Sequence, residues 1–182
     1  METVIRACLL ALALVPPHFA YSAASTTLGS SDASRCFQES QFALSDTGIE
    51  YCNRAIASGN LTRRDLAATY SNRGIIYSNI GKYQNALADH NKAIEIMPDL
   101  AEAYINRGNV YYHTHDYALA LSDYETASSK GARPAHTPYY NKALTLIRLN
   151  RKDDAKAAFE NALEHSPEST KIKQQLAELD SL

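Results

Sequence analysis

The sequence predicts an all-α fold, a solenoid of stacked helical hairpins closed by a C-terminal capping helix. Three observations lead to this prediction. The hexapeptide NRGIIY at 72–77 returns as NRGNVY at 106–111, thirty-four residues further along the chain. Apolar residues within each copy recur at the spacing of an amphipathic helix, and short polar segments such as NIGKY divide each copy in two. A period of this length is typical of repeat architectures, whose units stack to cover one another's apolar faces.

The composition is that of one small domain. The chain has 182 residues, of which 45% are hydrophobic, and its formal net charge is −2. A nucleic-acid-binding domain normally carries an excess of basic residues, and this chain has none. We therefore expect no nucleic-acid partner.

The first segment in chain order, 1–24, has the layout of a secretory signal peptide. Arg6 supplies a positive start, 7–15 is an apolar run too short to anchor the chain in a membrane, and small residues precede a cleavage point after Ala24. The alternative is a buried N-terminal helix. Cleavage predicts a periplasmic or secreted protein with no stable membrane anchor, in which the polar stretch 25–34 is a disordered arm.

Three aligned copies of the repeat follow, at 67–100, 101–134 and 135–168. Each copy reads as two helices joined by a short polar turn. Small residues at equivalent places allow the two helices to approach closely, namely Gly74, Gly108 and Ala143 on the first helix and Ala86, Ala120 and Ala155 on the second. A single hairpin cannot cover its own apolar face, so about three are needed for a stable core.

With these residues in register, the chain resembles the tetratricopeptide repeat family from Ala67 to Pro167. The resemblance implies a right-handed superhelical solenoid. The sequence departs from the family pattern in three respects. Tyr stands where Trp is usual, His90 occupies a place normally held by a bulky apolar residue, and the third copy lacks the Gly. None of these departures changes the expected fold.

Upstream, the segment 35–66 resembles a degenerate first repeat. The resemblance places Cys36 and Cys52 opposite one another across the hairpin, and an even pair of cysteines in an exported chain suggests a disulfide. Closing a loop of about sixteen residues would stabilise the fold by roughly 3 kcal/mol in the chain-entropy model. Two buried free thiols are the alternative.

Downstream, the segment 169–182 is expected to form the capping helix. Ile172, Leu176 and Leu179 fall on one face, and polar residues fill the other. The terminal unit of a solenoid needs such a polar outer face, because no further repeat covers it.

The sequence contains no catalytic pattern. His113 and His115 are two residues apart, and no third ligand stands at a fitting spacing, so no metal site is predicted. There is no Gly-rich phosphate loop and no nucleophile elbow. We therefore expect a protein that is not an enzyme and that needs no cofactor.

The resemblance also implies where a partner binds. In tetratricopeptide arrays the first helices of the hairpins line a concave groove that holds a peptide, and the sixth place of each copy here reads Asn72, Asn106 and Asn141. An Asn amide offers both a donor and an acceptor, so a ladder of three can hold the backbone of an extended peptide. Other groove-facing places add Asn109, Tyr112 and Tyr140. The alternative is that these asparagines bond within the array.

Two sets of cations bear on this groove. The family's carboxylate-clamp groove uses Lys and Arg on the first helices, and these are absent here apart from Arg148 near the edge, so a chaperone-tail function is not expected. A second set, at the seventh place of each copy, is expected to pair with acidic residues of the second helices such as Asp89 and Asp123. This set is Arg73, Arg107 and Lys142.

Together these features predict a non-catalytic scaffold that binds a protein or peptide partner in the groove. The alternative is a structural or assembly subunit of a cell-envelope complex, which acts through its outer or terminal surfaces and can include a homo-oligomer.

Overall fold

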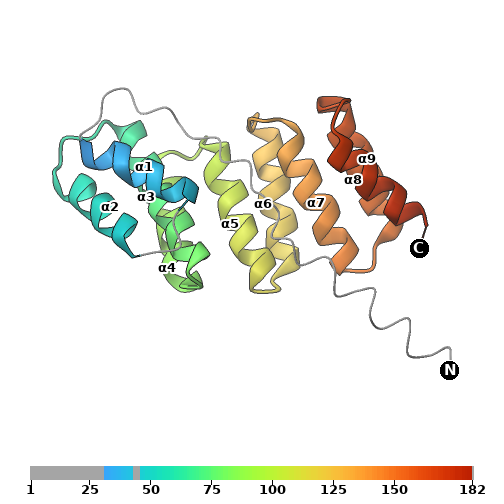
Figure 1. The fold of residues 1–182 in the computed structure, drawn as a ribbon, viewed down its shortest axis with the longest axis horizontal. Helices are drawn as coiled ribbons and strands as arrows, with labels where there is room; N and C mark the ends of the chain where they lie inside the picture. The colour runs from blue at the N-terminus through green and yellow to red at the C-terminus, as the bar shows by residue number, and fades with distance from the viewer. Residues whose placement is uncertain (1–30, 43–45, 182) are drawn as a thin grey trace.

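The computed structural model describes residues 31–42 and 46–181, and every regular element within them is a helix (Figure 1). In chain order these are α1 (Ser31–Phe42), α2 (Thr47–Ala57), α3 (Arg63–Asn79), α4 (Tyr83–Ile96), α5 (Ala101–His113), α6 (Tyr117–Ser129), α7 (His136–Arg148), α8 (Lys152–His165) and α9 (Thr170–Asp180). The leader expected at 1–24 and the first part of the expected arm, 25–30, lie outside the described residues.

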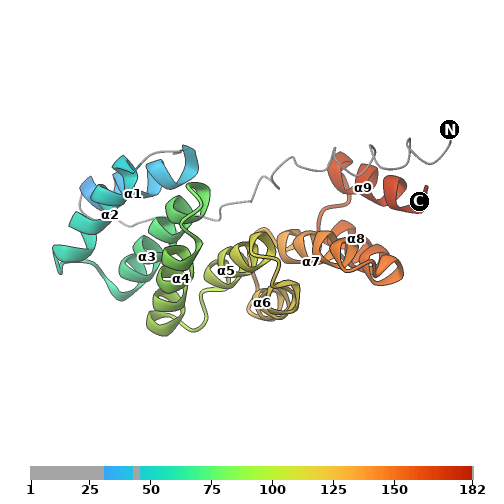
Figure 2. The ribbon, with the colours of Figure 1, turned by 90° about the horizontal axis from the view of Figure 1, so that it is seen from below.

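The helices form four hairpins and a terminal helix. Each odd-numbered helix from α1 to α7 pairs with the helix that follows it, consecutive hairpins pack on one another, and α9 packs on α8. Figure 1 shows the hairpins side by side in chain order, and Figure 2 shows α1 and α9 at the two ends of the array, on the side away from α6. The structure is therefore the expected all-α solenoid.

The turns inside the three full repeats share one conformation. Gly81, His115 and Asn150 hold equivalent places and have positive φ angles of 76°, 67° and 56°. After each of them, a backbone N–H bonds back to the last turn of the first helix, as from Lys82 to the carbonyl of Tyr77 at 2.8 Å. This bond satisfies a carbonyl that has no partner within the helix. The turn also reverses the chain direction, so that the second helix packs against the first.

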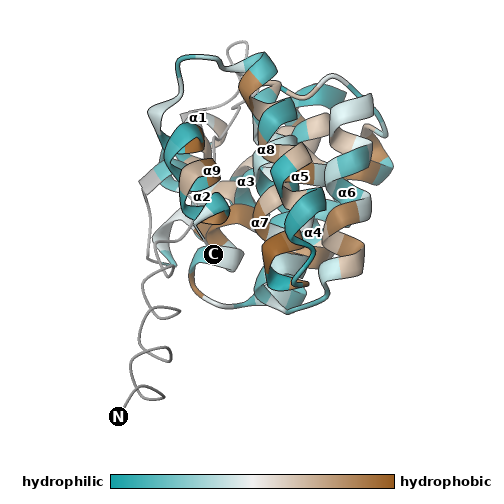
Figure 3. Ribbon diagram, turned by 90° about the vertical axis from the view of Figure 1, so that its right-hand side faces the viewer, coloured by the Kyte–Doolittle hydropathy of each residue, from teal (hydrophilic) through white to brown (hydrophobic). Residues whose placement is uncertain are grey.

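Close contact between the two helices of a hairpin depends on small residues. A Cβ atom on Gly74 would stand 2.7 Å from the ring of His90, and one on Gly108 would stand 2.7 Å from the ring of Tyr124. On the second helices the alanines of the repeat pattern are completely buried. In Figure 3 the helices carry both hydrophobic and hydrophilic residues, in keeping with one face packed in the core and the other in solvent.

The N-terminal boundary differs from the expected one. The arm was expected to extend to Ser34, whereas α1 begins at Ser31. Ala33 is buried in the hairpin, and Asp32 accepts two hydrogen bonds from the guanidinium of Arg54 on α2. These tertiary contacts order residues whose composition alone favours disorder.

The first hairpin contains the disulfide between Cys36 on α1 and Cys52 on α2, a separation of 16 residues. Both cysteines are completely buried, in a cluster with Ile49 and with Ile76 of α3. The bridge therefore lies at the junction between the first hairpin and the first full repeat.

At the other end, α9 begins with a capped turn, in which the Ser169 hydroxyl accepts a hydrogen bond from the backbone N–H of Ile172. Ile172 and Leu179 are buried against the core of α7 and α8, with Leu176 partly buried beside them. The helix thus covers the last hairpin. Among the described helices, none is both long enough and apolar enough to cross a membrane.

Candidate functional site

The residues expected to bind a partner all lie on the first helices of the full repeats. We call the side of the array formed by α3, α5 and α7 the inner face. On this face α3 contacts α5, and α5 contacts α7. The three ladder asparagines, one on each helix, are largely buried, with 5 to 9% of their surface exposed.

At the junction of the first two full repeats, Asn106 takes part in a buried chain of polar groups. Its Nδ2 donates to the Ser71 hydroxyl of the preceding repeat at 3.2 Å. The same hydroxyl lies 3.5 Å from Nδ1 of His90. The Asn106 amide therefore ties α5 to the hairpin before it.

The His90 ring in this chain is completely enclosed, and its Nε2 has no hydrogen-bond partner within the described residues. Burial, with a smaller contribution from the nearby positive charge of Arg107, lowers the pKa of His90 to about 3. His90 is therefore a neutral packing residue at physiological pH, and not a candidate acid, base or ligand.

The next junction repeats the same arrangement with different residues. Asn141 donates Nδ2 to Oδ1 of Asn109 at 3.0 Å, and the Tyr124 hydroxyl donates to the same oxygen at 2.9 Å. Tyr124 is the counterpart of His90, and burial raises its pKa well above the ordinary value. Asn109 takes the role of Ser71, although it stands one helical turn further along its helix.

Asn72, at the junction with the first hairpin, has no such chain. The disulfide of Cys36 and Cys52 occupies the place held by His90 and Tyr124 in the later hairpins. No side chain or backbone group within 31–42 or 46–181 hydrogen-bonds to the Asn72 amide. Of the three ladder asparagines, Asn72 is therefore the one whose amide makes no hydrogen bond within the described array.

The array uses only half of each remaining amide. Asn106 and Asn141 donate through Nδ2 and keep Oδ1, whereas Asn109 accepts through Oδ1 and keeps Nδ2. None of these remaining groups has a partner among the described residues, and none is among their buried polar atoms that lack a partner. Bonding within the array and bonding to a ligand are therefore compatible for these side chains.

Tyr112 on α5 and Tyr140 on α7 are each in contact with a cation. Arg148 donates Nε to the Tyr112 hydroxyl at 3.0 Å, and Lys171 of α9 places Nζ 4.7 Å from the centre of the Tyr140 ring. Burial, with smaller contributions from Glu178 and Tyr112, raises the pKa of Tyr140 to about 12. The Tyr140 phenol therefore stays neutral at physiological pH.

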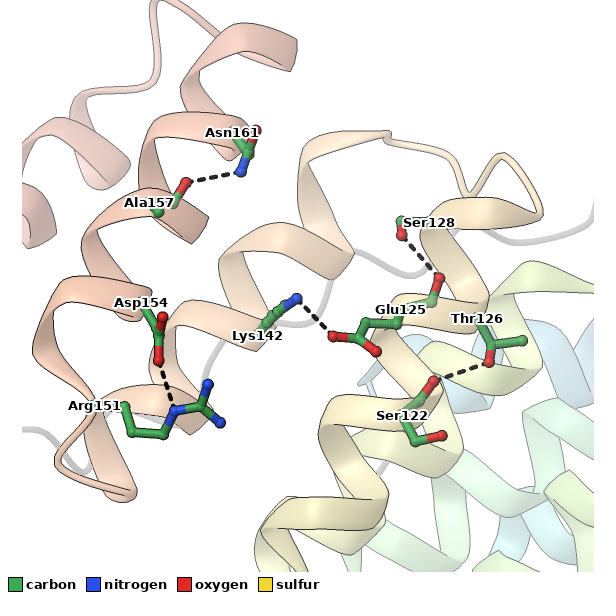
Figure 4. Close-up of polar contacts among 9 residues, drawn as sticks. All are labelled: Ser122, Glu125, Thr126, Ser128, Lys142, Arg151, Asp154, Ala157 and Asn161. Atoms are coloured by element: carbon green, nitrogen blue, oxygen red, sulfur yellow. Dashed lines mark hydrogen bonds and ion pairs between the residues drawn. The ribbon is translucent and has the colours of Figure 1, made fainter.

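The cations of the seventh place are bound within the array, as expected. Arg73 and Arg107 each donate two hydrogen bonds, of 2.6 to 2.8 Å, to Asp89 and Asp123 on their own second helices. Lys142 instead pairs with Glu125 of the preceding repeat at 2.7 Å (Figure 4). These side chains hold helices together and are not available to a partner.

The histidines of the described residues do not form a metal site. Within the part of the chain that the structure describes, no three or more His, Cys, Asp or Glu residues lie close enough to hold a metal ion. His113 stacks on Tyr83, and His115 shares a hydrogen bond of 2.8 Å with the Tyr117 hydroxyl. His113 is the last residue of α5, and His115 lies in the turn between α5 and α6.

Sequence reasoning missed two features of the site. The first is the acceptor at each repeat junction, which is Ser71 at one and Asn109 at the next. These two residues stand at different places of the repeat, the fifth and the ninth, so an alignment does not pair them. The polar His90 at an apolar place was the available signal for a buried polar chain. Lys171 was missed because its contact with Tyr140 depends on how α9 packs on the last hairpin.

The fold and the inner face together define a solenoid protein built from helical hairpins. Family models described as tetratricopeptide repeat match residues 67–100, 101–130 and 137–169, which make up just over half of the chain. The chain belongs to the tetratricopeptide repeat family. Among curated protein sequences, none matches it significantly.

Several solved structures share the fold. The tetratricopeptide protein TTC0263 of Thermus thermophilus superposes with a TM-score of 0.65 at 20% identity, over 74% of this chain and 72% of that one. YrrB, described as having an unusual peptide-binding site, gives 0.59 at 26% identity over 70% and 63% of the two chains. The first repeat domain of Spaghetti (RPAP3), bound to an HSP90 peptide, gives 0.60 at 23% identity over 65% and 93%.

Proposed function

We propose that this chain is a non-catalytic scaffold that binds an extended segment of a partner protein on its inner face. The observation that carries the proposal is the set of amide groups that the array leaves unused, both groups of Asn72 and one each of Asn106, Asn109 and Asn141. A peptide backbone offers alternating donors and acceptors, and this set contains both kinds. The family supports a role in protein interaction, and two of the similar structures are described as having a bound peptide or a peptide-binding site.

Asn72 provides the sharpest test, because its side chain makes no hydrogen bond within the described array. An array of ten-residue peptides of random sequence is probed with the purified protein, and the bound peptides are then titrated in solution. We expect Asn72→Ala to lower the affinity for these peptides by roughly fivefold or more, since one lost hydrogen bond costs about 1 kcal/mol. The matched control is Asn161→Ala on α8, whose one hydrogen bond to a described residue goes to the Ala157 carbonyl of its own helix (Figure 4). Equal affinity in the two variants would count against the ladder.

We further propose that the protein works in the periplasm or outside the cell after its leader is removed near Ala24. The layout of 1–24 supports this setting, as does a buried disulfide, which persists in oxidising compartments. N-terminal sequencing of the protein from the envelope fraction should begin near Ser25. Recovery of a chain that still begins at Met1 would contradict the proposal.

The alternative role, assembly through the outer surfaces, has less support. Leu119 and Leu149 are the large apolar side chains exposed within the described residues. Isolated exposed leucines are common on protein surfaces and do not define an interface.

A further inference from the structure

We propose that the C-terminal half of the inner face recognises acidic side chains of the bound segment, through Arg148 and Lys171. The inference rests on the proposed function and adds the chemical class of the partner. The surface consists of Tyr112, Tyr140, Leu144, Arg148 and Lys171, and we call it the α5–α7 patch.

Arg148 differs from the arginines of the repeat pattern. Arg73 and Arg107 are each held by two hydrogen bonds to an aspartate, whereas Arg148 has no carboxylate partner within the described residues. It is exposed, and its one described hydrogen bond, from Nε to the Tyr112 hydroxyl, fixes the plane of the guanidinium. Nη1 and Nη2 remain available, and a planar pair of donors is the geometry that binds a carboxylate.

Lys171 provides a second unpaired cation on the same patch. It lies over the ring of Tyr140 and has no carboxylate partner among the described residues. Glu178 of the same helix is a negative charge that acts on Tyr140, and its described hydrogen bonds come from Gln174 and Gln175 and not from Lys171. Neither cation is therefore neutralised by an ion pair within the described residues.

The two cations bracket an apolar stretch. Tyr140, Leu144 and Arg148 are spaced four residues apart on α7, so they lie along one side of the helix. From Tyr140, where Lys171 sits, to Arg148 the helix rises about 12 Å. An extended chain covers about that distance in four residues. The patch therefore fits a segment with two acidic residues about four places apart and apolar residues between them.

The other carboxylates on or near the inner face make no ion pair with Arg148 or Lys171 within the described residues. Glu102, in the first turn of α5, stands ten residues before Tyr112, about 15 Å along the helix from the Arg148 end of the patch, and it forms no ion pair with Lys171 within the described residues. Asp89 and Asp123 are nearly buried and are occupied by arginines. The charge presented at Arg148 and Lys171 is thus positive, which complements an acidic segment.

The test uses two labelled nonapeptides in fluorescence anisotropy with the full mature chain. One repeats Glu-Ser-Leu-Ser, which in an extended chain presents Glu and Leu alternately on one face, and the other has Gln in place of each Glu. Both are acetylated and amidated so that no terminal carboxylate is present. We expect the acidic peptide to bind about tenfold more tightly than the Gln peptide, with an affinity that falls as salt rises. Arg148→Gln and Lys171→Gln should each weaken only the acidic peptide, by about three- to tenfold.

The matched control is Arg151→Gln, because Arg151 is exposed close to Arg148 in the sequence but pairs with Asp154 in the first turn of α8 (Figure 4). This variant should bind the acidic peptide with an affinity within about twofold of that of the wild-type protein. Equal binding of both peptides, no binding of either, or an acidic peptide unaffected by Arg148→Gln would overturn the inference. If both peptides bind equally and Asn72→Ala weakens both, the proposed function stands and only the acidic preference fails.

Discussion

At the residue scale, the buried polar groups at the repeat junctions affect the stability of the fold. A polar group removed from water destabilises the fold unless it finds a partner. The Asn106 amide and the Ser71 hydroxyl meet this condition, whereas Nε2 of His90 lacks a partner among the described residues. Such a ring is tolerated only while it is neutral, which makes stability depend on pH.

The first prediction concerns that dependence. The pKa of His90 is about 3 in the folded chain, against an ordinary 6.5, so the unfolded chain binds the extra proton between these values. The contribution of His90 to the free energy of unfolding is therefore fully present above pH 6.5. It is lost as pH falls toward 3, by up to about 1.4 kcal/mol per pH unit. Urea unfolding from pH 7 to pH 4 should show this slope, and His90→Phe should flatten it. Burial also lowers the pKa of His113 and His136, so part of the slope should remain. An unchanged slope in His90→Phe would contradict the assignment.

The second prediction separates the ladder asparagines by stability. Asn106→Ala removes a bond between repeats, so it should lower the free energy of unfolding by about 1 to 2 kcal/mol. Asn72→Ala removes no hydrogen bond to a described residue, so it should cost less than about 0.5 kcal/mol. Parallel urea titrations measure both. Equal losses would mean that Asn72 is also bound within the array.

At the scale of the element, each hairpin is set by how closely its two helices approach. In the first two full repeats a glycine faces an aromatic ring, and in the third Ala143 stands at the same place, in one core cluster with Phe159. A Cβ on Gly108 would lie 2.7 Å from Cε1 of Tyr124 and 3.2 Å from Cβ of Asp123. The helices therefore cannot keep their present separation if this position gains a methyl group.

We accordingly expect Gly108→Ala to lower the free energy of unfolding by about 1 to 3 kcal/mol, although alanine favours helices more than glycine. Thermal unfolding followed by circular dichroism gives the value. In a Tyr124→Leu background the smaller side chain can yield, so the further loss should be smaller. A cost that is the same in both backgrounds would show that the ring is not the obstacle.

Much of the element-scale structure could be predicted from the sequence, because it depends on residue size at fixed intervals. The Gly and Ala positions place the helices of each repeat, and the polar segments place the turns. What could not be predicted depends on contacts between distant side chains. Residues 31–34 are helical because Ala33 and Asp32 meet α2, and no local pattern records this. Likewise, Ser71 and Asn109 both accept a hydrogen bond from the next repeat, but they stand at different places of the repeat. The alignment that identifies the repeats therefore does not show that the two residues are equivalent.

At the scale of the whole molecule, each hairpin packs mainly on its neighbours in the chain. The stability of such an array is close to a sum of terms for each repeat and each junction. At the equivalent places the first hairpin lacks the small residue, Gly or Ala, and the Tyr that the full repeats carry on their first helices, and the disulfide joins its two helices. Local unfolding of the first hairpin is therefore largely independent of local unfolding in the distant repeats.

This leads to the fourth prediction. Replacing Cys36 and Cys52 by Ser should remove about 3 kcal/mol of stabilisation from the first hairpin, as expected for a closed loop of 16 residues. Amide hydrogen exchange should become fast in α1 and α2 and change little in α7 and α8. The wild-type protein after mild reduction provides a second form of the same test. Uniform loss of protection along the chain would show that the molecule unfolds as one unit.

The two polar junctions also have a consequence for how the chain can lengthen. The repeat 101–134 carries Asn106, which donates to the repeat before it, and Asn109, which accepts from the repeat after it. Its leading and trailing surfaces are therefore complementary to each other. A gene that encodes this segment twice in tandem should yield a folded protein one hairpin longer, since the one new boundary places the Asn106 amide of the second copy against an acceptor, Asn109 of the first. Since this repeat carries both halves of the pairing, its duplication preserves the hydrogen bonds between repeats.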